Sequence, residues 1–262
     1  MIPTVLTATV ALMTVFALAY LVARRIDNYG IVDFVWAYCF TGVAWFYALS
    51  GSGWSSRALV IAALASIWSI RLGSHLYRRV MGHHPQEDSR YGQLREDWQA
   101  NFGPMMFGFF QLQAVSIVIL SAPFLFPTRN AFPGFNLWEI IGTAVCFLAL
   151  VGETVADGQL AAFRRNPNNE GQVCDVGLWR YSRHPNYFFE WCIWVGFCLF
   201  ACGSAWGWLS VIAPAAILHL LLNVTGVPMA EASSLKSKGD AFRAYQRTTN
   251  AFFPGPPRRP TP

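Results

Sequence analysis

Seven long apolar stretches separate the polar parts of this chain, and they limit what it can fold into. They cover roughly residues 2–23, 30–49, 58–77, 105–126, 137–156, 186–202 and 206–227. A helix needs about 20 mostly apolar residues to cross the hydrocarbon core of a membrane. Only 13% of the residues are charged, whereas an average soluble domain has about 25%. We therefore predict an all-α integral membrane protein with seven transmembrane helices.

The distribution of cations predicts the orientation. Sixteen of the 19 Lys and Arg residues fall on one side of the seven stretches, and Arg57 and Arg129 fall on the other. Cytoplasmic loops carry an excess of Lys and Arg. We expect the N-terminus outside the cell membrane and the C-terminus in the cytoplasm. The polar segment 231–253 is expected to form a cytoplasmic amphipathic helix, and residues 255–262 to be disordered after Pro254.

Ionisable residues within the apolar stretches are costly in a membrane and point to function. They are Asp33, Arg71, His75, Glu153, Asp157 and Glu190. All belong to the cytoplasmic half of their stretches in this orientation, which indicates one polar cavity open to the cytoplasm. The alternative is that pairs such as Asp33–Arg71 or Glu153–Arg164 lock helices together.

The segment Arg183-His184-Pro185-Asn186-Tyr187 marks the start of the sixth stretch. Proline suits the first turn of a helix, where its missing N–H is not needed. Asn186 and Glu190 then share one helix face, because residues four apart are neighbours. Arginine pairs bidentately with phosphate, so Arg164, Arg180 and Arg183 predict a ligand that carries phosphate beside a hydrogen-bonding head group.

Metal and disulfide chemistry find little support in the sequence. His83 and His84 are adjacent and no third ligand follows at useful spacing, so no metal site is expected. The six cysteines form no CxxC pair and fall mostly in apolar stretches, where small packing residues are the favoured interpretation.

Two motifs resemble a known family. The segment Arg183–Tyr187 with Glu190, and the tail Tyr245–Pro254, resemble the C-terminal half of the steroid 5α-reductase superfamily, and bacterial membrane homologues in particular. The segments Asn28–Trp36 and Glu87–Tyr91 are also similar to that subgroup. The superfamily includes sterol reductases and, more distantly, isoprenylcysteine carboxyl methyltransferases.

The resemblance implies one membrane domain, residues 1–254, that holds NADPH in a cytoplasm-facing cavity. Helices 1–4 (1–126) would face the substrate, and helices 5–7 with the tail helix (127–254) would bind the cofactor. The expected cofactor contacts are Asp157, Arg164, Arg180, Arg183, His184, Asn186, Tyr187, Glu190, Glu231 and Arg247. Asn186 and Glu190 would hold the nicotinamide carboxamide, and the arginines the phosphates.

The same resemblance implies the catalytic groups. The reductases place a Glu on helix 2 and a Tyr on helix 3 at the substrate carbonyl. Asp33 is the nearest match to the Glu. Alignment on Arg71 puts Trp68 at the tyrosine position, and Tyr77 lies further along, so both stay candidates. A carboxyl in apolar surroundings stays protonated more readily, which would let Asp33 donate a hydrogen bond.

The expected function is NADPH-dependent reduction of the carbon–carbon double bond of an apolar enone, such as a 3-oxo-Δ4-steroid. We expect the protein in the inner cell membrane, with its substrate entering sideways from the lipid. No nucleic acid or obligate protein partner is expected. Two alternatives stay open. One is an S-adenosylmethionine-dependent methyltransferase, in which Glu231 would suit the cofactor's amine; the other is a transporter or lipid-binding protein.

Overall fold

A computed structural model describes residues 1–258, and every regular element in that range is a helix. The chain divides into two compact units. Unit 1 contains residues 1–136 together with 201–210, and unit 2 contains residues 137–200 together with the chain from residue 211 onward. The functional division at residue 126, between substrate-side and cofactor-side helices of one domain, stays a prediction. Each unit is described by itself.

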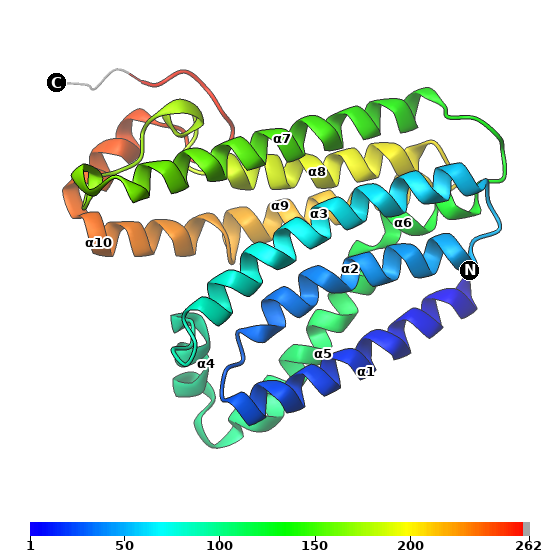
Figure 1. Ribbon diagram of the computed structural model, residues 1–262, viewed down its shortest axis with the longest axis horizontal. Helices are drawn as coiled ribbons and strands as arrows, with labels where there is room; N and C mark the ends of the chain where they lie inside the picture. The colour runs from blue at the N-terminus through cyan, green and yellow to red at the C-terminus, as the bar shows by residue number, and fades with distance from the viewer. Residues whose placement is uncertain (259–262) are drawn as a thin grey trace. The chain divides into compact units, whose positions relative to one another are not determined.

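Unit 1 is a bundle of antiparallel helices (Figure 1). Its elements are α1 (Ile2–Ile26), α2 (Ile31–Ser50), α3 (Ser55–Gly82), α4 (Ser89–Trp98), η1 (Gln99–Asn101), α5 (Phe102–Leu120), α6 (Ala122–Leu125) and η2 (Pro127–Arg129). Helix α2 packs along α3, and α1 packs against α2 and α5. Helix α4 is short and polar, and Tyr91 is its one buried residue.

Unit 2 is built on two long helices that lie side by side, α7 (Leu137–Arg165) and α8 (Pro185–Cys202) (Figure 1). The turns η3 (Pro167–Asn169) and η4 (Gly177–Arg180) lie in the segment that joins them. After η5 (Gly207–Val211) follow α9 (Ile212–Asn223) and α10 (Val227–Thr248). Helix α10 breaks at Gly239, whose φ of 51° favours glycine.

Within the described residues, six segments are long and apolar enough to cross a membrane. They are Ile2–Ile26, Ile31–Ser50, Ser55–Gly82, Ser89–Leu120, Leu137–Arg165 and Gly207–Thr248. The prediction of seven is therefore supported for six. The remaining helix, α8, has 18 residues, and the polar Asn186 and Glu190 in its first two turns lower its hydropathy. The expected tail helix 231–253 is part of α10 and ends at Thr248.

Hydroxyl groups join α2 to α3 inside unit 1. Thr41 donates its hydroxyl proton to the Ser69 hydroxyl at 2.9 Å, and Trp45 Nε1 donates to the Ser66 hydroxyl at 3.0 Å. The Ser69 hydroxyl in turn donates to the Ala37 carbonyl at 2.6 Å. Such bonds hold helices together where the surroundings offer no water.

Glycines bring α7 and α8 into close contact in unit 2. A Cβ added at Gly142 would lie 2.4 Å from the backbone nitrogen of Phe200, and one at Gly196 would lie 2.5 Å from the sulfur of Cys146. Small residues allow backbones to approach in this way. The contact fixes the spacing of the two helices that carry the predicted cofactor residues Asp157 and Asn186.

Residues 255–258, which we expected to be disordered, bond to the rest of unit 2. The Gly255 amide donates to the Tyr181 carbonyl at 3.0 Å, and the Arg258 amide donates to the Thr248 carbonyl at 2.7 Å. The rest of that predicted segment, residues 259–262, lies outside the described residues.

A Gly142→Ala variant should lower the thermal unfolding midpoint of the detergent-solubilised protein. The added methyl group meets backbone atoms that cannot move aside, and overpacking of this kind costs about 1–3 kcal/mol. The matched control is Gly158→Ala on the same helix, because a Cβ at Gly158 meets nothing within 4 Å. That variant should keep or raise the midpoint, and an equal loss in both would contradict the close-packed contact.

Candidate functional site

A polar pair stands at the start of α8 in unit 2. Asn186 follows Pro185 in the first helical turn, and its Nδ2 donates to Oδ1 of Asp157 on α7 at 3.3 Å. The other amide atom, Asn186 Oδ1, is buried and accepts no hydrogen bond from the residues of the described chain. Burying an unsatisfied polar atom costs free energy, and nearly all such atoms in proteins have a partner. This oxygen therefore points to a ligand that donates a hydrogen bond.

One turn further along α8 are the next predicted residues. Trp194 Nε1 donates to Oε1 of Glu190 at 3.0 Å, which fixes the orientation of that carboxylate. The ring of Tyr187 stacks on the imidazole of His184, with 5.4 Å between ring centroids and 7° between planes.

Trp179 connects the three segments around this pair, a role that no pattern in the sequence indicated. Its Nε1 donates to the Ala156 carbonyl on α7 at 2.9 Å, and its own carbonyl accepts the hydroxyl proton of Tyr245 on α10. The indole is buried, with 7% of its surface exposed. Trp179 thus fixes η4 against the ends of α7 and α10.

The guanidinium group of Arg183, a predicted phosphate ligand, bonds to other groups of the protein. Its Nη2 lies 2.6 Å from Oε1 of Glu231, and its Nη1 donates to the carbonyls of Gln246 and Thr249 at 3.2 and 2.5 Å. His184 Nε2 lies 3.3 Å from the same carboxylate oxygen. Gln246 Nε2 donates to the second oxygen of Glu231 at 2.6 Å. We call this group the Arg183 clamp, and it holds the C-terminal segment against the start of α8.

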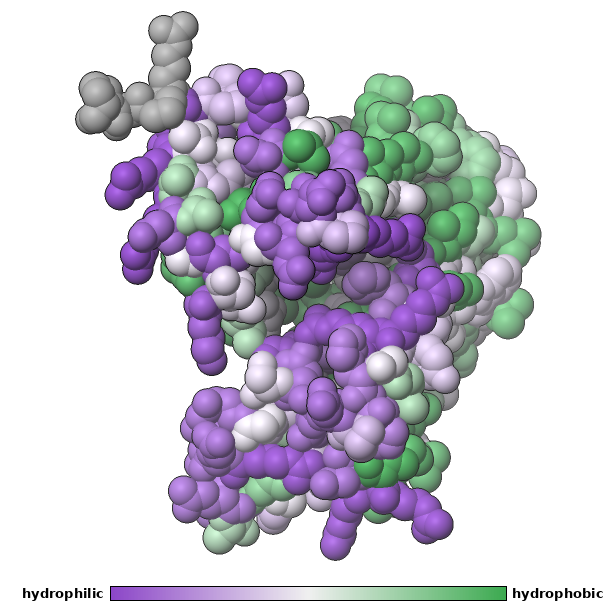
Figure 2. All heavy atoms as spheres, turned by 60° about the vertical axis from the view of Figure 1, so that its left-hand side comes forward, coloured by the Kyte–Doolittle hydropathy of each residue, from purple (hydrophilic) through white to green (hydrophobic). Residues whose placement is uncertain are grey.

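Three other predicted arginines have open guanidinium groups. Arg164 at the end of α7, Arg180 in η4 and Arg247 at the end of α10 are exposed, and within residues 1–258 they make no hydrogen bond or salt bridge. They belong to the three segments that Trp179 connects. Hydrophilic residues cover much of the face that comes forward in Figure 2, and apolar residues gather toward its right-hand side. These cations are therefore available to an anionic ligand.

A second polar cluster lies in unit 1 and contains Asp33. Oδ2 of Asp33 lies 2.6 Å from Nη2 of Arg90, and Oδ1 accepts the hydroxyl proton of Tyr91 at 2.7 Å. Both oxygens therefore act as acceptors, as in an ionised carboxylate. Tyr91 is 2% exposed. The sequence had singled out Glu87–Tyr91 as a motif but had not identified Tyr91 as the partner of Asp33.

Asp88 holds Arg90 in place. Its Oδ1 lies 3.0 Å from Nε of Arg90, and its Oδ2 pairs with Arg79. Burial alone would raise the pKa of Asp88, but hydrogen bonds from Arg90 and the charges of Arg90 and Arg79 hold that pKa down to about 2. Asp88 is thus ionised at neutral pH and keeps Arg90 against Asp33.

The two other predicted catalytic residues differ in how far they are buried. Trp68 is fully buried and packs against Phe40, with 5.2 Å between ring centroids. Tyr77 is 48% exposed and packs against Phe34 at 5.3 Å. Their catalytic assignment stays a prediction. The side chains that bond to the Asp33 carboxylate are those of Arg90 and Tyr91.

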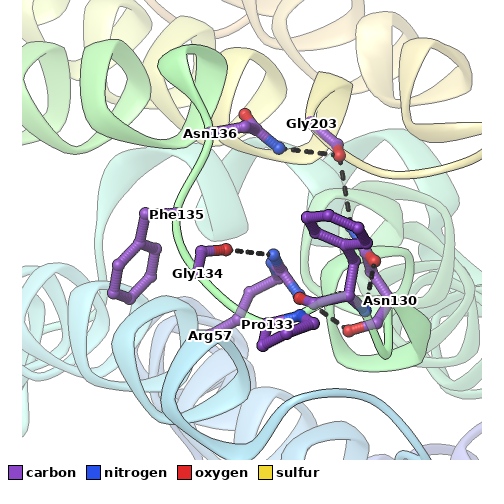
Figure 3. Close-up of a pocket in the computed structure, with 8 residues that line it drawn as sticks. Arg57, Asn130, Pro133, Gly134, Phe135, Asn136 and Gly203 are labelled. Carbon is purple, nitrogen blue, oxygen red and sulfur yellow. Dashed lines mark hydrogen bonds between the residues drawn. The ribbon is translucent and has the colours of Figure 1, made fainter.

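A cavity of about 290 Å³ opens at the opposite end of unit 1 from α4 and is lined by none of the predicted site residues (Figure 3). Its lining residues are Arg57, Asn130, Phe132, Pro133, Gly134, Phe135, Asn136 and Gly203. The described part of the chain holds no group of three or more His, Cys, Asp and Glu side chains arranged to bind a metal. All six cysteines are free thiols.

A Glu231→Ala variant should destabilise the protein by about 3 kcal/mol, because removing one partner of a mostly buried ion pair leaves the other charge uncompensated. The side chains of Arg183 and Glu231 are only 11% and 15% exposed. Asp240→Ala on the same helix is the control: the Asp240–Arg243 pair is 94% and 65% exposed, and its loss should change stability by less than about 0.5 kcal/mol. Chemical denaturation in detergent measures both, and equal effects would contradict the clamp.

Comparisons with known proteins place the chain in a family. It is 26% identical over 254 residues to an uncharacterized protein of the fission yeast Schizosaccharomyces pombe, and the match covers 87% of this chain and 73% of the yeast protein. No solved structure matches the chain. A family model described as a protein of unknown function, DUF1295, matches residues 19–249. Because that match spans most of the sequence, the chain belongs to the DUF1295 family of membrane proteins.

Proposed function

We propose that this protein is an NADPH-dependent membrane reductase that saturates the carbon–carbon double bond of an apolar enone, such as a 3-oxo-Δ4-steroid. The observation that carries the proposal is in unit 2. There, a buried amide oxygen without a protein partner, Asn186 Oδ1, belongs to the same unit as three open guanidinium groups.

The residues present fit this cofactor at both of its ends. The nicotinamide carboxamide has an NH2 group that can donate to Asn186 Oδ1 and a carbonyl that needs a donor. Asn186 Nδ2 has two protons, of which one is donated to Asp157, so the second can serve that carbonyl. Asp157 and Glu190 add acceptor oxygens to the same polar wall. Arg164, Arg180 and Arg247 offer forked donors for the pyrophosphate and the 2′-phosphate. When bound, the cofactor supplies the hydride.

The Arg183 clamp changes which of the predicted residues we expect to contact the cofactor. Arg183, His184 and Glu231 bond to one another and to the tail, so we propose that they position the site and do not contact phosphate. The clamp keeps α10, and with it Arg247, next to the start of α8. Three of the ten predicted cofactor residues thereby become positioning residues.

For the donor to the substrate carbonyl we propose Tyr91. Asp33 is ion-paired to Arg90 and accepts the one hydroxyl proton of Tyr91, so it fits a carboxylate that holds the phenol in place. When substrate binds, this proton would turn from Asp33 to the carbonyl oxygen, where a hydrogen-bond donor stabilises the negative charge that develops during hydride addition to the β-carbon. Asp33 keeps a role, but as the residue that positions Tyr91.

We also propose that α8 crosses the membrane, which gives seven spans and puts the termini on opposite sides. Its 18 residues extend about 27 Å at 1.5 Å per residue, close to the thickness of the hydrocarbon core. With the N-terminus outside, 16 of 19 cations face the cytoplasm, in agreement with the positive-inside rule. The cofactor residues of unit 2 then face the compartment that contains NADPH.

One argument for the main alternative, an S-adenosylmethionine-dependent methyltransferase, no longer holds. Glu231 had been a candidate partner for the amine of that cofactor, but both of its oxygens already accept hydrogen bonds from Arg183, His184 and Gln246. Three open arginines also suit a ligand with several phosphates better than a zwitterion.

NADPH should bind the purified protein more tightly than NADH, and Arg164→Ala, Arg180→Ala and Arg247→Ala should each weaken NADPH binding about tenfold, as the loss of a charge-assisted hydrogen bond predicts. Arg25→Ala, which removes an exposed cation of unit 1, is the control and should change nothing. In vesicles, only inverted membranes should oxidise NADPH, because the cofactor does not cross the bilayer. Stabilisation by S-adenosylmethionine alone would refute the reductase, and binding of none of these ligands would favour a transporter.

Tyr91→Phe should lower the reduction rate of an enone probe such as progesterone at least about a hundredfold while NADPH affinity stays unchanged, as loss of a hydrogen-bond donor to the transition state predicts. Tyr20→Phe is the control: that hydroxyl donates to the Gly103 carbonyl at 3.1 Å, also within unit 1, and has no part in the Asp33 cluster. Full turnover in Tyr91→Phe would remove Tyr91 from the donor role without affecting the cofactor assignment.

A further inference from the structure

We propose that the loop end of unit 1 is a rigid anchor that docks into the phospholipid headgroup layer. Five aromatic residues form its surface, here called the aromatic platform: Trp54, Phe132, Phe135, Trp206 and Trp208. The inference does not depend on the proposed enzymatic function.

A buried arginine makes the platform rigid. Arg57 on α3 is 1% exposed, and its guanidinium donates to the carbonyls of Asn130 and Phe132 at 2.7 and 2.9 Å and to the Gly134 carbonyl at 2.7 Å (Figure 3). Its Cζ lies 5.4 Å from the ring centroid of Trp54. One side chain thus fixes the path of the whole loop between η2 and α7.

Amide groups tie this loop to the segment that carries Trp206 and Trp208. Nδ2 of Asn130 and Nδ2 of Asn136 both donate to the Gly203 carbonyl, at 3.2 and 2.9 Å (Figure 3). On its other side the loop pairs with the α2–α3 turn, where the Trp54 amide donates to the Asn130 carbonyl at 2.9 Å. Three loops that are distant in sequence therefore form one hydrogen-bonded body.

The rings on this body are exposed although their backbone is fixed. Phe132 is 76% exposed, Trp206 66%, Trp208 60% and Phe135 42%. Trp206 has a φ of 64°, a left-handed conformation that is uncommon for a residue with a side chain. Rigid loops that present several large aromatic rings mark an interaction surface.

The chemistry of the platform favours a lipid headgroup layer as its partner. It lies where the spanning helix α2 ends at Ser50 and α3 begins at Ser55. Tryptophan is enriched at this level of a membrane, since its ring is apolar and its N–H polar. The guanidinium group of Arg57 points inward to backbone carbonyls. The surface of the platform therefore consists of aromatic rings above amide groups, and the charge of Arg57 is not exposed there. A bilayer interface takes up both kinds of group.

Depth-dependent fluorescence quenching tests the proposal. The emission of Trp206 and Trp208 is obtained as the difference between the wild-type protein and a Trp206→Phe/Trp208→Phe variant in phosphatidylcholine vesicles. We expect bromines placed near the headgroup end of the acyl chains to quench this emission at least about twofold more than bromines near the chain ends, because interfacial tryptophans lie at headgroup level. Trp68→Phe gives the control difference for a fully buried indole, which should respond weakly to either probe.

Three outcomes would overturn the proposal. Strong quenching by iodide in the aqueous phase with little effect of bromines would place the loops in water. Stronger quenching by the deep bromines would place them in hydrocarbon. Loss of both signals on formation of an oligomer would assign the platform to a second copy of the chain. Phenylalanine keeps the aromatic volume, so the variant tests depth without removing packing, and elution volume in detergent verifies its fold.

Discussion

Two arginines, Arg57 fully buried and Arg183 mostly buried, hold the loop before α7 and the chain at the end of α10. Backbone carbonyls beyond a helix end need hydrogen-bond donors, and near a membrane water cannot be relied on to supply them. Arg57 in unit 1 donates to three carbonyls of the loop before α7. Arg183 in unit 2 donates to the carbonyls of Gln246 and Thr249 at the end of α10. A guanidinium group is suited to the task because its donors point outward in a fixed plane. Without these donors, the loops would have to open to solvent.

Contacts of arginine within the protein also determine which predicted site residues keep open side chains. In unit 2, Arg183 bonds to the tail and to Glu231, so among the arginines predicted to bind phosphate those with open guanidinium groups are Arg164, Arg180 and Arg247. The clamp and Trp179 keep the segments that carry these groups together. In unit 1, Arg90 has the corresponding place beside Asp33, where Asp88 holds it. An ion pair of this kind is poor evidence for stability by itself, but it determines which side chains reach the carboxylate it touches.

Apolar length predicted much of the fold, because a membrane leaves few alternatives to a helix of about 20 residues. It also located α8, since the predicted stretch 186–202 matches Pro185–Cys202. Asn186 and Glu190, the polar residues near its start, reduce its hydropathy, and α8 is not among the six segments that are long and apolar enough to cross a membrane. The link between the motif at 183–187 and the tail was visible only as two separate resemblances. The structure explains their joint presence: Arg183 bonds to Glu231 and to tail carbonyls, so neither segment can keep its conformation without the other.

The roles of individual arginines could not be predicted, and the reason is physical. An arginine side chain looks the same in the sequence whether its partner is a phosphate, a carboxylate or a backbone carbonyl, and carbonyls occur at every position. Arg183 differs from Arg180 because backbone carbonyls reach its guanidinium group. The positions of these carbonyls depend on the break of α10 at Gly239 and on the path of the tail. Tyr91 illustrates the same limit. Its contact with Asp33 joins residues 58 positions apart. The two residues meet because α4 and α2 both pack against α5. Residues that take part in local motifs are therefore predictable from sequence, whereas the division of those residues into binding and positioning groups depends on long-range backbone contacts.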